Sequence, residues 1–115
     1  IGPDNRLTDK KFDELDKKYG TEVADGTDYQ VNRIREGKPG AADHDLPGIG
    51  QDPNKIAEYL NKWKGKATHK DTQQGSSVAY DDAKGVLIVD NGYNIHAYKY
   101  PRDKFYGNEE RYKRN

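Results

Sequence analysis

The stretch Val86-Leu-Ile-Val-Asp90-Asn-Gly-Tyr-Asn-Ile95-His-Ala-Tyr-Lys-Tyr100 contains the densest apolar run of the chain and its clearest turn. Asn-Gly between two β-rich runs is a strong hairpin signal, because both residues tolerate the positive φ that a type I′ turn needs. With Asn91 and Gly92 as a two-residue loop, Ile88 is expected opposite Ile95. The stretch therefore predicts two antiparallel strands at the centre of the fold.

The alternation of side chains along these strands predicts one apolar and one polar, aromatic face. The first face carries Val86, Ile88, Ile95 and Ala97. The second carries Asn94, His96, Tyr98 and Tyr100. If Tyr80 lies opposite Val86 across the preceding turn, Val78 and Tyr80 join the apolar face and Ser77 joins His96. The polar face is expected to be open to solvent or ligand.

The composition describes a small polar domain with no disulfides. The chain has 115 residues, 31% hydrophobic and 35% charged, and its net charge is zero. It has no Cys, so it has neither a disulfide framework nor a thiolate metal site. No apolar run approaches the length of a membrane span. Because the chain also has no Met, we expect it to be a piece of a longer polypeptide.

The remaining pattern predicts one α+β domain over residues 1–115, with N-terminal helices packed on one face of a C-terminal antiparallel four-stranded sheet. Its expected parts are a linker (1–7), a helical part (8–36), an active-site loop (37–51), a helix (52–65), the sheet (66–100) and a charged tail (101–115).

Capping residues predict the bounds of the helices. Thr8 is an N-cap for a helix over residues 9–19, and Asp52 is an N-cap for the third helix, with Pro53 at its first position. Between them, Gly26 is expected to break a second helix within residues 21–36.

Histidines are the candidate catalytic residues. His44 lies in the loop between two aspartates, His69 on the first strand and His96 on the polar face of the last strand. Two histidines at one phosphodiester suffice for RNA cleavage without a metal: one takes the proton of the ribose 2′-OH, and the other protonates the leaving oxygen. Lys, Ser, Thr and Tyr groups would stabilise the charge on the phosphate. Candidate substrate contacts are Thr68, Lys70, Ser77, Lys99, Tyr100 and Arg102.

Other interpretations remain open for these residues. Each histidine, His69 most of all, also suits an ordinary exposed imidazole, and Tyr98 and Tyr100 suit ordinary sheet aromatics. Lys38 and Lys70 suit solvated lysines. The sequence Asp43-His44-Asp45 also suits a metal-dependent nuclease, although no HExxH, CxxC or EF-hand motif accompanies it. A non-catalytic module that docks a protein on the open sheet face is the main alternative from another class.

The order of parts over residues 37–100 resembles the nuclease domains of the colicin D type, within the barnase/EndoU/colicin/RelE group of ribonuclease toxins. Four segments carry the resemblance: the loop from Lys38 to His44, the helix of residues 52–60, the strand of residues 75–80 and the hairpin of residues 86–99. The resemblance implies that His44 is the general base, with Lys38 near it. The last-strand positions are His96 and Tyr98; here His96 stands where the family has a small hydroxyl residue, which puts the acid and base roles in doubt.

The resemblance also implies a biological setting. It implies a metal-independent, cofactor-free tRNase that leaves a 2′,3′-cyclic phosphate and acts in interbacterial competition, such as contact-dependent growth inhibition. Such a domain is the C-terminal part of a secreted or cell-surface effector, and it is delivered to the cytoplasm of target bacteria. A cognate immunity protein blocks its active site, and a host factor in the target cell can be required.

Overall fold

The computed structural model describes residues 7–36 and 42–115, which form an α+β fold with a five-stranded antiparallel sheet. The helical elements are Asp9–Tyr19 (α1), Thr21–Glu36 (α2), the 3-10 turn Ala42–His44 (η1), Pro53–Trp63 (α3) and Arg102–Tyr106 (α4). The strands are His69–Asp71 (β1), Ser77–Asp81 (β2), Val86–Asp90 (β3), Ile95–Lys99 (β4) and Tyr112–Arg114 (β5), in the order β4-β3-β2-β1-β5. None of the helices in these ranges is long and apolar enough to cross a membrane.

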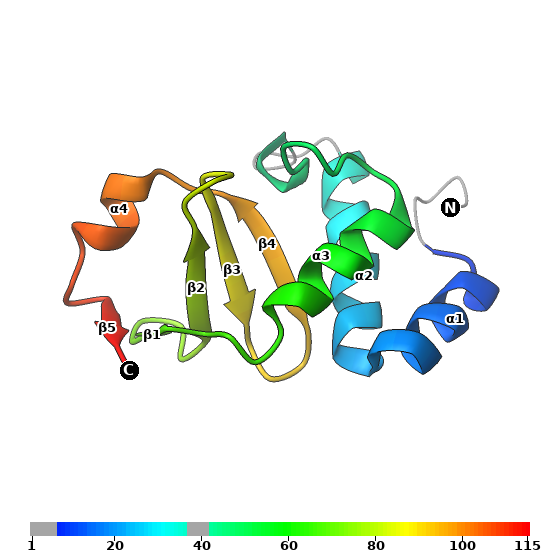
Figure 1. Ribbon diagram of the computed structural model, residues 1–115, viewed down its shortest axis with the longest axis horizontal. Coiled ribbons are helices and arrows are strands. Elements are labelled where there is room, and N and C mark those ends of the chain that lie inside the picture. The colour runs from blue at the N-terminus through cyan, green and yellow to red at the C-terminus, as the bar shows by residue number, and fades with distance from the viewer. Residues whose placement is uncertain (1–6, 37–41) are drawn as a thin grey trace.

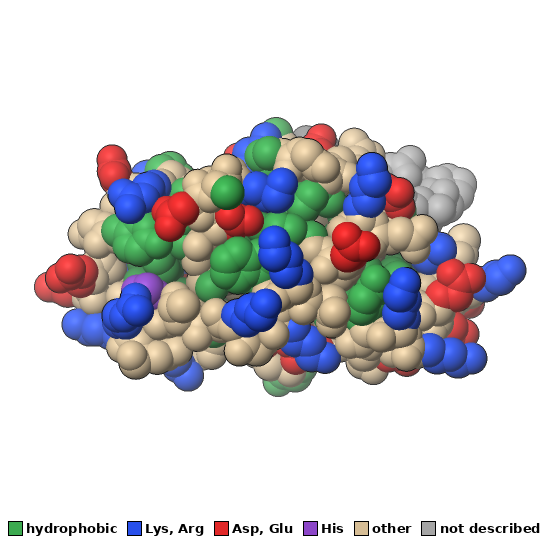
Figure 2. Space-filling view, in the orientation of Figure 1, with side chains coloured by type: hydrophobic (Ala, Val, Ile, Leu, Met, Phe, Trp, Pro, Cys, Tyr) green, Lys and Arg blue, Asp and Glu red, His purple; other side chains and the backbone are tan. Residues whose placement is uncertain are grey.

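Helices α1, α2 and α3 form one end of an elongated molecule (Figure 1). The helices α2 and α3 lie beside β4, and α1 packs on α2 away from the sheet. At the other end, α4 and β5 follow the sheet. Basic and acidic side chains are interspersed over the face seen in Figure 2, as the zero net charge leads one to expect.

Two helices begin where their N-caps predict, although α3 ends at Trp63 rather than at Gly65. The hydroxyl of Thr8 accepts a hydrogen bond from the N–H of Lys11 at 3.1 Å, and α1 ends at Tyr19. The carboxylate of Asp52 accepts one from the N–H of Asn54 at 2.9 Å at the start of α3. Local hydrogen bonding therefore fixes these helix starts, as N-cap residues generally do.

The break expected at Gly26 is wrong, because α2 runs through it without interruption. A Cβ at this position would lie 1.7 Å from the carbonyl oxygen of Ile95. Gly26 therefore serves a packing purpose: it lets α2 approach the backbone of β4 closely. A glycine within a helix costs about 1 kcal/mol relative to alanine, and this tertiary contact outweighs that cost.

The hairpin of β3 and β4 has a longer loop than the two-residue turn expected. Ile88 lies opposite Ala97, so the register differs by two residues from the predicted pairing with Ile95. The side-chain oxygen of Asn91 accepts hydrogen bonds at 2.8 and 2.9 Å from the N–H groups two and three residues later, which closes a four-residue loop over 91–94. Because the shift is even, the two predicted faces of this hairpin are preserved.

The register of β2 differs from the predicted one and places each of its side chains on the opposite face of the sheet. Tyr80 lies opposite Leu87 rather than the residue before it, and an odd shift moves every side chain of the strand to the other face. Ser77 therefore faces the helices, on the opposite side of the sheet from His96, and the expectation that these two residues share a face is wrong. The turn before β3 holds four residues, 82–85, which sets this register.

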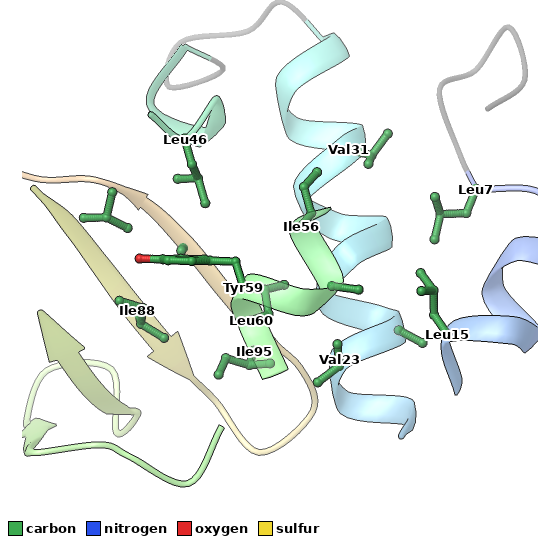
Figure 3. Packing of buried hydrophobic residues seen from close by; sticks show 14 residues of the cluster. Leu7, Leu15, Val23, Val31, Leu46, Ile56, Tyr59, Leu60, Ile88 and Ile95 are labelled. Carbon is green, nitrogen blue, oxygen red and sulfur yellow. The ribbon is translucent and has the colours of Figure 1, made fainter. Parts of the chain in front are cut away.

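The sheet has a core on each face. Helices α2 and α3 cover the face of Ile88 and Ile95, where Tyr59 and Leu60 of α3 fill the space toward the sheet (Figure 3). The other face was expected to be open, but part of it is covered by a second cluster. That cluster consists of Val78, Tyr80, Leu87, Phe105 and Tyr112.

The charged tail is an ordered part of the fold, which corrects the four-stranded sheet to five strands. The strand β5 pairs antiparallel with β1 at the edge of the sheet. Phe105 of α4 is 1% exposed and stacks on Tyr80 with ring centroids 5.4 Å apart. Two apolar anchors, Phe105 and Tyr112, thus hold a segment whose other residues are mostly charged and exposed.

Candidate functional site

Four aromatic rings meet where η1 and α2 reach the polar face of β4. Tyr29 packs against His44 and His96, with ring centroids 5.9 and 4.7 Å away. Tyr98 lies 5.6 Å from His44 and 6.4 Å from His96 by the same measure. The structure therefore brings together His44, His96 and Tyr98, three residues that the sequence singled out, and adds Tyr29 from α2.

Gln30 joins the three elements that carry this cluster. Its side-chain nitrogen donates to the carbonyl oxygens of His44 at 2.7 Å and Ala97 at 2.6 Å. Its side-chain oxygen accepts from the N–H of Ala97 at 3.1 Å. Because Gln30 is fully buried, these bonds form away from competing water, and they fix the His44 loop against the edge of β4.

The surroundings of His96 fix one tautomer of its ring and lower its pKa. Its Nδ1 lies 2.8 Å from the side-chain oxygen of Asn94, and since that oxygen is only an acceptor, Nδ1 carries the proton and Nε2 the lone pair. Burial and, to a smaller extent, the positive charge of His44 lower the pKa of His96 to about 4, although Asp90 opposes this. At neutral pH the ring is therefore an uncharged proton acceptor.

His96 and Tyr98 both line a cavity of about 340 Å³ that also contains Arg111 and Asp71. The guanidinium of Arg111 donates to the two carboxylate oxygens of Asp71, each at 3.0 Å. Burial raises the pKa of Tyr98, so its phenol keeps its proton at neutral pH. The cavity thus combines a neutral imidazole, a phenol and a guanidinium that is paired with a carboxylate.

The pair of Arg111 and Asp71 is itself held in place. The carboxylate of Asp71 also accepts from the N–H groups of Gln73 and Gln74, at 3.0 and 3.2 Å. Burial raises the pKa of this carboxyl, but the bonds from Arg111 and the two N–H groups outweigh burial, so its pKa is lowered. The carboxylate is therefore ionised at neutral pH and orients the guanidinium in the cavity.

His44 lies next to Tyr98 and is buried, with 6% of its surface exposed. It does not line the cavity of His96. The aspartates on either side of it do not complete a metal centre: within residues 7–36 and 42–115, no three His, Asp or Glu side chains converge as ligands. Lys38, which the resemblance places near His44, lies outside the described residues.

His69 lies far from the other two histidines. His69 and His96 lie in the same row across the sheet, with Val78 and Val89 between them. The two histidines are therefore separated by three strand spacings, about 14 Å. His69 packs instead against Phe105, with ring centroids 4.8 Å apart. The structure therefore does not bring His69 into the ring cluster.

The predicted substrate contacts are dispersed. Thr68 lies beside His69, with its hydroxyl oxygen 2.7 Å from the ring Nδ1, while Lys70 pairs with Ser77 and shares the helix-facing side of the sheet. Arg102 pairs with Asp82 at 3.0 Å. Lys99 and Tyr100 line a second hollow that Tyr98 also lines. Only these last two lie next to the ring cluster.

Sequence reasoning missed several members of the site. Asn94 had been assigned to the polar face, and its spacing of two residues from His96 was a usable signal for the contact. Arg111 gave no sequence signal, because it lies in a run of charged residues, 40 positions from its partner Asp71. Gln30 gave no signal either, because nothing local in the sequence indicates its bonds to His44 and Ala97.

Comparison of the chain with protein-family models, with curated proteins and with solved structures finds no match. A function for this domain is therefore argued from the ring cluster, the cavity beside it and the resemblance over residues 37–100.

Proposed function

We propose that this domain is a metal-independent ribonuclease in which His96 is the general base. The observation that carries the proposal is the contact between Asn94 and His96, which leaves Nε2 of a neutral imidazole as the proton acceptor beside a cavity. A general base near a reacting hydroxyl contributes about 10²–10⁴ to the rate. The resemblance assigned that role to His44; the burial of His44 favours His96 instead.

The proposed reaction is transfer of a phosphodiester onto the neighbouring ribose oxygen. Nε2 of His96 takes the proton of the 2′-OH as the 2′-oxygen bonds to phosphorus. The bond from phosphorus to the 5′-oxygen breaks, and the phenol of Tyr98 protonates that oxygen. The products are a 2′,3′-cyclic phosphate and a 5′-hydroxyl. Arg111 lines the same cavity and would stabilise the charge that builds on the phosphate oxygens.

His44 acts through its neighbours in this proposal. Its ring packs on Tyr98, and its positive charge lowers the pKa of His96. His44 therefore keeps His96 unprotonated over a wider pH range and supports the ring of Tyr98. This arrangement uses two of the three candidate histidines, His44 and His96, in different roles from a simple acid and base pair.

The resemblance supplies the biological part of the proposal. It favours tRNA as substrate, delivery of the domain into a competing bacterium and neutralisation by an immunity protein that covers the site. Since the net charge of the chain is zero, binding of such a polyanion would depend on local basic groups rather than on the field of the whole domain.

Incubation of the purified domain with total tRNA and EDTA tests the proposal. The wild type should give discrete fragments that end in a 2′,3′-cyclic phosphate, and His96→Gln should give none. His69→Gln is the matched control, because it changes a histidine on the same face outside the site, and it should cleave like the wild type. Intact tRNA with the wild type, in the presence of extract from the target cells, contradicts the proposal. Cleavage that EDTA stops indicates a metal-dependent nuclease.

A protein-docking module is the second candidate. It is favoured by the exposure of Tyr93, at 82%, in the loop before β4, and of Tyr29, at 37%, in the ring cluster. Aromatic residues are enriched in protein interfaces. A docking module would leave all RNA intact, so the cleavage assay separates the two candidates.

A further inference from the structure

Tyr98 also lines a second hollow, of about 650 Å³, at the end of β4. Three lysines line it, namely Lys84, Lys99 and Lys104, against one carboxylate, that of Asp43. Lys84 already donates to the carbonyl of Pro47 at 2.8 Å. Lys99 and Lys104 are exposed, and within the described part of the chain neither has a carboxylate partner. The hollow is therefore a locally basic surface on a domain of zero net charge.

The edge of the sheet adds a backbone donor to this hollow. The N–H of Tyr100 points inward, to the carbonyl of Gly85 at 3.1 Å, whereas the N–H of Ala97 points outward, to Gln30. Because N–H directions alternate along a strand, the N–H of Lys99 also points outward. Since β4 is an edge strand, this N–H has no strand partner among the residues that the structure describes, and it can donate to a ligand in the hollow.

The same edge is closed to an added strand. Gln30 occupies both backbone groups of Ala97, and Gly26 lies against the carbonyl of Ile95. An extended peptide needs several consecutive edge groups to pair, and only those at Lys99 remain. The hollow therefore suits a compact anion better than a strand from another protein.

We propose that this hollow binds a phosphate of single-stranded RNA that neighbours the scissile phosphate, through Lys99, Lys104 and the N–H of Lys99. The inference rests on the proposed function, and Tyr98, which both cavities share, connects the two phosphate positions. The ring of Tyr100 in the same wall offers a surface on which a base stacks, a contact that tolerates any sequence.

Binding of a short fluorescein-labelled DNA strand tests this inference without cleavage, because DNA lacks the 2′-OH. The double variant K99A/K104A should weaken binding about tenfold at low salt and reduce the slope of log K against log salt by about 0.7, since one phosphate contact contributes about 0.7 in single strands. The matched control K10A/K17A removes two exposed lysines from α1 and should leave the slope unchanged. Titration should also shift the Lys99 amide signal in NMR spectra.

Equal losses in the two double variants, or a Lys99 amide that does not move, overturn the inference. Cleavage of tRNA, measured in parallel, keeps the two proposals apart. Cleavage that is unaffected in K99A/K104A overturns the inference and leaves the ribonuclease standing. Lysine-dependent binding without any cleavage by the wild type overturns the ribonuclease and leaves an anion site.

Discussion

The side-chain oxygen of Asn94, the last residue of the loop before β4, lies 2.8 Å from Nδ1 of His96 on that strand. This contact places the lone pair of His96 on Nε2. It resembles the way in which many catalytic histidines are oriented, where a fixed partner of one ring nitrogen sets the chemistry of the other.

Asn94→Ala tests this relationship. Without the Asn94 oxygen as acceptor, the Nδ1–H tautomer of His96 is no longer favoured. We therefore expect the rate of RNA cleavage to fall about tenfold or more. Nitrogen NMR of the imidazole should show Nδ1 protonated in the wild type and a mixture of tautomers in the variant. Asn61→Ala, an exposed position on α3, is the control and should match the wild type. A variant that retains both tautomer and rate contradicts the role of Asn94.

His44→Gln should move the pH dependence of cleavage. Burial is the main cause of the low pKa of His96, and the charge of His44 adds to it. Removing that charge raises the pKa of His96. Because a general base acts unprotonated, the loss of activity on acidification should begin at a higher pH in the variant than in the wild type. A lower rate with an unchanged pH profile would mean that His44 supports packing alone.

Gln30→Leu should destabilise the domain strongly. The change leaves three buried backbone groups, at His44 and Ala97, without their partners. A buried unsatisfied group costs about 1–3 kcal/mol, so we expect the free energy of unfolding in urea to fall by about 3 kcal/mol or more. Gln73→Leu, at an exposed position, is the control. A small effect at Gln30 would show that water replaces its bonds.

Glu22→Gln should stabilise the domain at neutral pH. Burial raises the pKa of Glu22, and the nearby Asp90 raises it further. A raised folded-state pKa means that this group's stabilisation is complete below its ordinary value of 4.5 and is lost as the pH rises through the folded-state value. The variant should therefore gain thermal stability relative to the wild type as the pH increases above about 4.5. A difference in melting temperature that does not change with pH contradicts the assignment.

The sequence predicted those parts of the fold that local chemistry determines. Thr8 and Asp52 set the starts of α1 and α3 through side-chain bonds to their own helices. The faces of β3 and β4 followed from alternation and survived a register error, because Asn91 widened the loop by two residues. Gly26 was misread because its reason is a contact with Ile95, far away in the sequence.

The residues of the candidate site likewise fall into those that the sequence indicated and those that only the folded chain brings together. His44, His96 and Tyr98 stood out by residue type and position. Arg111 and Gln30 did not, since each acts through partners that only the folded chain brings near: Asp71 for one, the edge of β4 for the other. The contribution of β5 was missed because two apolar anchors in a charged segment give no periodic signal.

The most direct test of the central claim is sequencing of RNA 3′ ends from bacteria that express the domain. With the wild type, we expect discrete new ends in tRNA that carry a 2′,3′-cyclic phosphate, and we expect none with His96→Gln. The same ends in both strains, or no new ends with the wild type, would contradict the claim that His96 is the base of a ribonuclease.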